Sequence, residues 1–393
     1  MTAEPMADTG KRPNQRPKPK VEIVNGLRGV AILAVVWQHL FGQYFKPGSP
    51  VALDAAAGPA LYLSYGWIGV QLFFVLSGFV LYLPYAEGRV ALDFAGFYRR
   101  RAARLLPLYY IVAALCLVLN QPVPEGTKFL AELASMGLVL FPFVNHGFEP
   151  YLNPPLWSLG VEIWFSALFP FVVLALRRYG VVPLLVATTL IGCVSRALGQ
   201  AGGVMPLSAG LTANLEVFGA GMALAGWYAA GNRLTRPRLA AGAGALVVLA
   251  AIWAKQAALP GAAVLFFDGL TVGLALVLAG LLSLESGLLR AAFANRPIQV
   301  IGMMCFSFYA WHEPLLRHVF QADLAPLAGL GGTLPVYLVS LAVIGALSYR
   351  FIEFGRVADW RTLFLLPPAW NLRVSRGFQI VRSASGRPER RPS

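Results

Sequence analysis

The sequence contains few charged residues. Only 13% of its residues are Asp, Glu, Lys or Arg, whereas 57% are hydrophobic. A water-soluble chain of this length needs many more charges to cover its surface. The hydrophobic runs recur up to about residue 354, and they have the ~20-residue length of membrane-spanning helices rather than the alternating pattern of a β-barrel. The low charge content therefore excludes a soluble globular protein and predicts an all-α, polytopic membrane protein.

Cysteine and histidine are also scarce. The three cysteines, Cys116, Cys193 and Cys305, fall inside hydrophobic runs without paired spacing, so we interpret them as small apolar residues. A metal site needs three or four converging ligands, and the four histidines show no metal-site spacing. We therefore expect no metal and no permanently bound cofactor. The sequence also lacks a signal peptide and the inverted repeats of many secondary transporters.

Basic residues outnumber acidic ones, 32 to 18, which gives a net charge of +14. This charge does not indicate nucleic-acid binding, because the basic residues lie in the two tails and in a few short loops. Such a distribution is typical of the cytoplasmic segments of membrane proteins. If residues 120–156 form one outer loop, the basic tails and the basic loops all fall on one side. The charges therefore predict about ten spans, with both termini cytoplasmic.

We expect three parts in the chain. Residues 1–20 form a disordered basic cytoplasmic tail, residues 21–356 a membrane domain, and residues 357–393 an interfacial and disordered tail. The stretch 129–144 is expected to be interfacial or re-entrant, because it is short and contains Glu132 and Pro142. The ~40 residues after the last run are too few for a further domain. The expected spans are about 27–45, 62–84, a third ending near 119, 157–177, 181–199, 213–230, 238–257, 262–283, 298–319 and 334–354.

Two ionisable residues, Arg28 and His39, lie in the first hydrophobic run. Their separation corresponds to ~16 Å along a helix and about three turns, so both side chains project from nearly the same face. We expect Arg28 at the membrane surface and His39 near mid-depth. Ionisable groups inside a membrane are costly and mark functional sites. A histidine at this depth is suited to be a general base, a proton relay or a metal ligand.

The most basic internal segment is Tyr98–Pro107, which contains four arginines. Guanidinium groups bind phosphate oxygens in a bidentate manner, so this segment suits a ligand with several phosphates at the inner surface. The alternative is that the arginines only fix the topology beside lipid headgroups. Arg99 and Arg100 fit that alternative better than Arg101 and Arg104, which have a helical i,i+3 spacing.

Several ionisable residues fall in the outer half of the predicted spans: His39, Glu162, Glu216, Asp268, His312 and Glu313. Glu162 follows Ser158 by one turn and shares its helix face. His312 precedes Pro314, which frees a backbone carbonyl and can break the helix. Glu216 and Asp268 have a simpler interpretation as groups that form hydrogen bonds between helices.

Four segments, in their order along the chain, resemble the acyltransferase-3 family of membrane-bound, acyl-CoA-dependent O-acyltransferases. They are Asn25–Ala31 extended to His39, Phe73–Phe79, Arg101–Pro107 and Leu156–Glu162, with a weaker fifth segment at Ser307–Pro314. The resemblance covers about residues 22–354. The chain departs from the family at two points. Asn25 stands where many relatives have Asp, and Gly160-Val-Glu162-Ile163 keeps one acid of the usual Ser-Val-Glu-Glu.

The resemblance implies about ten helices and an O-acyltransferase of the bacterial inner membrane. Such an enzyme moves an acyl group, here expected to be acetyl, from cytoplasmic acyl-CoA to a hydroxyl of a surface or exported glycan. The expected partners are therefore acyl-CoA, a glycan acceptor and membrane lipids. The alternative is a transporter or flippase of a lipid-linked glycan, in which the same polar residues line a pathway and no acyl-CoA is needed.

The resemblance implies that Arg28 and His39 are the paired arginine and histidine of the family, and that Arg101 and Arg104 are its pair near the acyl donor. Together with the arguments above it predicts three sets of site residues. They are Arg28, Arg101 and Arg104 for the donor, His39 and Glu162 for catalysis, and Trp157, Ser158 and His312 for substrate binding.

Overall fold

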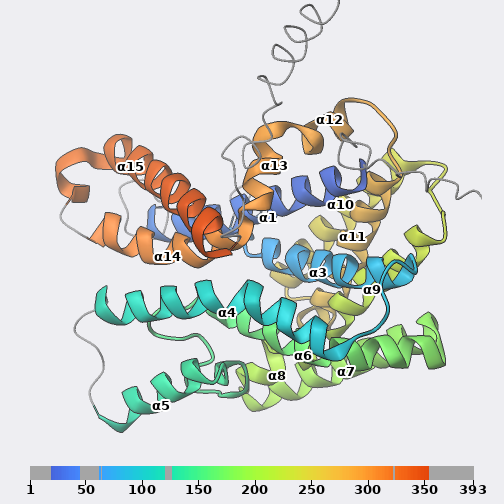
Figure 1. Ribbon diagram of the computed structural model, residues 1–393, viewed down its shortest axis with the longest axis horizontal. Coiled ribbons are helices and arrows are strands. Elements are labelled where there is room, and N and C mark those ends of the chain that lie inside the picture. The colour runs from blue at the N-terminus through green and yellow to red at the C-terminus, as the bar shows by residue number, and fades with distance from the viewer. Residues whose placement is uncertain (1–18, 45–61, 63, 120–125, 322–323, 354–393) are drawn as a thin grey trace, which may run out of the picture.

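The computed structural model describes residues 19–44, 62, 64–119, 126–321 and 324–353 (Figure 1). Within these residues all regular elements are helices, which confirms the predicted all-α class. Apart from residues 19 and 20, the tails predicted at 1–20 and 357–393 lie outside the described residues.

Nine segments of the described chain are long and apolar enough to cross a membrane. Their composition explains this, because long hydrophobic runs satisfy their backbone hydrogen bonds only as helices when water is excluded. The chain is therefore a polytopic membrane protein, as predicted. The segments are Glu22–Leu40 within α1 (Pro19–Tyr44), α3 (Ile68–Ala86), α4 (Phe94–Leu119), α6 (Leu156–Tyr179), α7 (Val181–Gly202), Met205–Ala229, α10 (Pro237–Gln256), α11 (Ala262–Leu282) and Thr333–Glu353.

Two of these segments are composite. Met205–Ala229 joins the short α8 (Met205–Ala209), the 3₁₀ turn η2 (Thr212–Asn214) and α9 (Leu215–Ala229). Thr333–Glu353 combines most of α15 (Leu324–Ser348) with the π-helical turn η3 (Tyr349–Glu353).

The stretch predicted at 129–144 does not span. It forms α5 (Thr127–Gly137), which has 11 residues, and the 3₁₀ turn η1 (Phe141–Phe143). An 11-residue helix is ~16 Å long, about half the thickness of the hydrocarbon core. Two side chains tie the stretch to neighbouring helices, since Tyr109 Oη donates to the Met136 carbonyl at 2.6 Å and Trp164 Nε1 donates to the Val139 carbonyl at 2.7 Å.

The span expected at 298–319 is divided into two helices. They are α13 (Arg296–Met303) and α14 (Cys305–Gln321), which meet at Met304. Close packing against α1 accompanies the division: a Cβ on Gly302 would lie 1.8 Å from the carbonyl oxygen of Asn25, and one on Gly29 would lie 2.3 Å from that of Ile298. Gly29 of the first family segment and Gly302 of α13 thus let α13 cross α1 closely. The short helix α12 (Leu288–Ala294) precedes α13.

Glu216 and Asp268 join helices, as their simpler interpretation predicts. Both carboxylates pair with Arg196 of α7, a fully buried residue that the sequence did not single out. Its Nη2 lies 2.6 Å from Asp268 of α11, and its Nη1 bonds Glu216 of α9 and the Ala213 carbonyl. Charges this deeply buried persist only when they are paired, so this cluster is a structural link between three helices.

Candidate functional site

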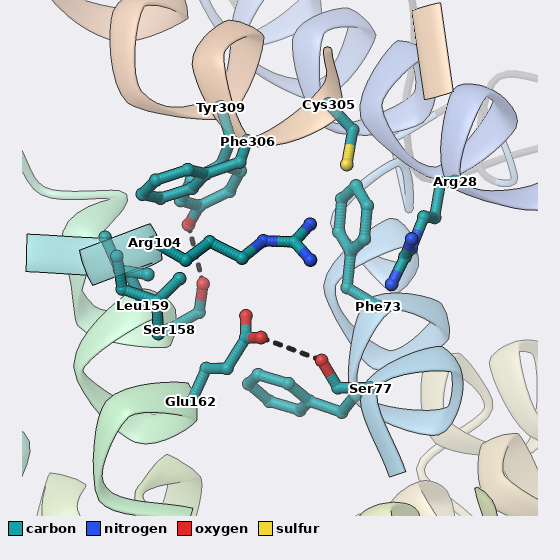
Figure 2. Close-up of a pocket in the computed structure, with 12 residues that line it drawn as sticks. Arg28, Phe73, Ser77, Arg104, Ser158, Leu159, Glu162, Cys305, Phe306 and Tyr309 are labelled. Carbon is teal, nitrogen blue, oxygen red and sulfur yellow. Dashed lines mark hydrogen bonds between the residues drawn. The ribbon is translucent and has the colours of Figure 1, made fainter. Parts of the chain in front are cut away.

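The five family segments, which are separated in the sequence, each contribute to one pocket (Figure 2). The pocket lies among α1, α3, α4, α6 and α14. Aromatic and aliphatic side chains form much of its wall, and polar groups are placed between them. The lining residues are Arg28, Phe73, Phe74, Ser77, Arg104, Leu105, Ser158, Leu159, Glu162, Cys305, Phe306 and Tyr309.

Arg28 lies in α1, within the candidate span Glu22–Leu40. Its guanidinium extends into the pocket from the α1 side, and that of Arg104 extends from the α4 side (Figure 2). Two guanidinium groups in one pocket repel each other and favour an anionic ligand between them.

Glu162 is held at the pocket wall by α4 and α3. Its Oε1 lies 2.9 Å from Nη2 of Arg101 and accepts a hydrogen bond of 2.8 Å from Ser77 Oγ. Arg101 Nε donates to Ser166 at 3.0 Å. The side chains of Arg101 and Glu162 are 13% and 23% exposed, so the pair is only partly hydrated. Arg101 is not among the pocket-lining residues, and in this structure it orients Glu162.

Arg104 has a carboxylate neighbour in η3. Its Nη2 lies 3.9 Å from Oε1 of Glu353, whose other oxygen accepts a hydrogen bond of 3.0 Å from Ser307. The side chain of Glu353 is fully buried, while that of Arg104 is 35% exposed. Arg104 is therefore anchored on one side and open to the pocket on the other.

The three residues predicted for substrate binding do not all line the pocket. Ser158 lines the pocket, and its Oγ lies 2.6 Å from the hydroxyl of Tyr309, which also bonds the Pro155 carbonyl. Ser158 thus fixes a wall residue. Trp157 does not line the pocket, since its ring packs against Phe148 with 5.5 Å between centroids.

His39 and His312 lie together beside the pocket wall. Their rings meet edge to face, with 4.8 Å between centroids. His312 is fully buried, and its Nδ1 lies 2.6 Å from the carbonyl oxygen of Tyr309, a pocket-lining residue. His39 Nδ1 lies 3.1 Å from Oε2 of Glu313. No hydrogen bond or ion pair joins His39 to Glu162, both of which the structure describes, so the carboxylate next to His39 is Glu313.

Some polar groups in or beside the site were not predicted as site residues. Ser77 entered only as part of the segment Phe73–Phe79, Glu353 was not singled out, and Glu313 was noted only as an ionisable residue in the outer half of the spans. Arg317 follows Glu313 by four positions, and this i,i+4 spacing was a usable signal for a charged pair. Among the described residues, no group of three or more His, Cys, Asp and Glu side chains is arranged to hold a metal ion.

Comparison with known proteins agrees with the resemblance. Peptidoglycan O-acetyltransferase OatA of Listeria monocytogenes is 24% identical over 374 residues, which cover 87% of this chain and 57% of that protein. O-acetyltransferase OatA of Staphylococcus aureus is 22% identical over 384 residues, covering 84% and 56%. The chain thus spans little more than half the length of these relatives.

"Protein 2 in picA locus" of Rhizobium radiobacter is 31% identical over 177 residues, which cover 40% of this chain and 84% of that protein. No solved structure was found to match the chain. The family model described as "Acyltransferase domain" matches residues 21–353. Because this match includes most of the chain and all five pocket-forming segments, the chain belongs to the acyltransferase-3 family.

Proposed function

We propose that this protein is an O-acetyltransferase of the bacterial inner membrane. It moves an acetyl group from acetyl-CoA on the cytoplasmic side to a hydroxyl of a surface or exported glycan. The observation that carries the proposal is the single pocket in which Arg28, Arg104 and Glu162 meet an apolar wall. The names of the two OatA relatives support acetyl transfer, and the distribution of basic residues supports cytoplasmic termini.

The donor binds between the arginines. Arg28 and Arg104 enter the pocket from opposite helices, and their guanidinium groups bind phosphate oxygens of CoA. Aromatic side chains such as Phe73 and Phe306 pack against the pantetheine arm and the acetyl group, which have few charges. Arg101 contributes by holding Glu162, whose carboxylate accepts a hydrogen bond from a substrate amide or hydroxyl.

His39 acts as the general base. It takes the proton of the acceptor hydroxyl while the hydroxyl oxygen attacks the thioester carbonyl carbon. The bond between that carbon and sulfur then breaks, and the imidazolium returns the proton to the leaving CoA thiolate. The products are an acetyl ester and CoA. The other route is nucleophilic: His39 first accepts the acetyl group and then passes it to the acceptor. An acetylated enzyme trapped without acceptor would favour that route.

The test uses the purified full chain in liposomes, with radiolabelled acetyl-CoA and fragments of peptidoglycan as acceptor. We expect transfer of label by the wild-type protein and a loss of at least ~100-fold in His39→Ala. His146→Ala is the matched control, because His146 is an exposed histidine outside the site. Wild-type-like transfer by well-folded His39→Ala contradicts the catalytic role of His39.

The same liposomes discriminate the flippase alternative. A flippase moves a lipid-linked glycan across the bilayer without acetyl-CoA, so glycan translocation without label transfer would overturn the proposed function. Mass spectrometry of the surface glycans of cells with and without the protein then identifies the acceptor, through acetyl groups that disappear together with the protein.

A further inference from the structure

Helix α14 places one carboxylate between a histidine and an arginine. Oε2 of Glu313 lies 3.1 Å from Nδ1 of His39, and Oε1 lies 2.9 Å from Nε of Arg317. The Glu313 side chain is 9% exposed, compared with 31% for His39. We propose that Glu313 is a positioning residue, which holds the His39 ring with its proton on Nδ1 and leaves Nε2 as the base. This inference rests on the proposed function of His39.

The tautomer follows from the chemistry of the two groups. An ionised carboxylate accepts hydrogen bonds and donates none, so the ring nitrogen within its reach is the one that carries the proton. In a neutral imidazole the other nitrogen then has the free lone pair. This is the arrangement in which a carboxylate orients a histidine base and stabilises the imidazolium that forms during proton transfer.

Arg317 stabilises the ionised carboxylate of Glu313 at this buried position. A charge this deeply buried requires partners, and Arg317 supplies one from the same helix, four residues on. The Nη1 of Arg317 also donates to the Tyr151 carbonyl at 3.2 Å, which fixes the guanidinium to the segment before α6. One oxygen of Glu313 is therefore occupied by Arg317, and the other is directed to His39.

His312 restricts the movement of the His39 ring from another side. Its imidazole contacts that of His39 edge to face, and its own Nδ1 lies against the Tyr309 carbonyl. Since a carbonyl oxygen only accepts hydrogen bonds, that nitrogen of His312 carries its proton. The charged and titratable groups around His39 in the described chain are thus Glu313, with Arg317 behind it, and His312. Of these groups, Glu313 is the one that an ion-pair distance joins to a ring nitrogen of His39.

The experiment compares Glu313→Gln with Glu313→Asp in the liposome assay. The Gln variant keeps the shape but loses the charge, and we expect kcat to fall ~100-fold with the KM values for acetyl-CoA and acceptor within about twofold of wild type. The Asp variant keeps the charge, and we expect its kcat to be at least about tenfold higher than that of the Gln variant. Arg317→Gln should lower kcat less than Glu313→Gln, because it removes the support and leaves the carboxylate.

Glu132→Gln is the matched control, since Glu132 lies in α5, accepts a hydrogen bond from the Leu152 amide at 3.4 Å and forms none with His39 in the described part of the chain. It should retain wild-type kcat. Binding of acetyl-CoA to each variant verifies that the protein is folded. If Glu313→Gln does not fold, the kcat values of Glu313→Asp and Arg317→Gln test the role of Glu313 instead.

Three outcomes overturn the inference: wild-type kcat in folded Glu313→Gln, an increase confined to KM, or wild-type kcat in both Glu313→Asp and Arg317→Gln when Glu313→Gln cannot be folded. These outcomes differ from failure of the proposed function. If His39→Ala is inactive while Glu313→Gln is fully active, only the positioning role fails. If the wild-type protein transfers no acetyl group, the proposed function itself fails.

Discussion

Arg101 and Glu162 form an ion pair between α4 and α6, with 2.9 Å between Nη2 and Oε1. The carboxylate lines the pocket and the guanidinium stands behind it, with Ser77 as a further donor. Arg101 therefore influences the pocket through Glu162. This relationship separates Arg101 from Arg28 and Arg104, although the sequence placed all three in the donor site.

The ion pair predicts energetic coupling. Arg101→Ala leaves Glu162 with only Ser77 as a bonded partner, and we expect it to lower both the melting temperature in detergent and the acetyl-transfer rate. Adding Glu162→Gln should restore part of the lost stability, with a coupling of about 0.5–3 kcal/mol. Thermal unfolding of the two single variants and the double variant measures this coupling. Arg99→Ala, at an exposed arginine of the same helix, is the control. Additive losses would show that the pair is not coupled.

Arg28 and Arg104 should determine donor affinity. Each charge-assisted hydrogen bond to phosphate contributes about 1.5–3 kcal/mol, so Arg28→Ala and Arg104→Ala should each weaken acetyl-CoA binding at least tenfold. Calorimetric titration with acetyl-CoA measures this effect. Arg100→Ala is the matched control, because Arg100 is exposed and outside the pocket lining. Unchanged affinity in both pocket variants would restrict these arginines to a structural role.

The crossing of α1 and α13 should tolerate no side chain at Gly302. A Cβ there would lie 1.8 Å from the Asn25 carbonyl oxygen, so Gly302→Ala must move α13 relative to α1. We expect a loss of at least about 1–3 kcal/mol, as for overpacking in a core. Gly242→Ala in α10 is the control, since nothing lies within 4 Å of its added Cβ. It should be neutral or slightly stabilising, because Ala favours helix over Gly. Equal melting temperatures for the two variants would contradict the crossing.

Much of the fold could be predicted from the sequence. The cost of placing a segment in a membrane is the sum of contributions from its own residues, so the hydrophobic runs predict where helices lie. The same local property showed that 129–144 is too short to span, which α5 confirms. The Met304 division was missed, because it coincides with close packing of Gly302 on Asn25 of another helix.

The candidate site, too, could be predicted from the sequence only in part. The family segments predicted which parts of the chain meet, and all five line one pocket. The partners inside the site were not predicted. His39 and Glu162 were both predicted for catalysis, but Glu162 bonds Arg101 and Ser77, and the carboxylate next to His39 is Glu313. Arg196 was missed altogether, because its acidic partners lie on two other helices.

By itself the sequence determined the helical membrane class, the family and the segments that carry the chemistry, because hydropathy, charge and motif spacing are properties of the chain read locally. Only the tertiary structure decided which charges pair. Pairing depends on the rotation and approach of neighbouring helices, set by small residues such as Gly29 and Gly302 at their crossings. A shift of one position turns a side chain by ~100° about its helix, so the pattern along one helix does not tell which neighbouring helix supplies its partner.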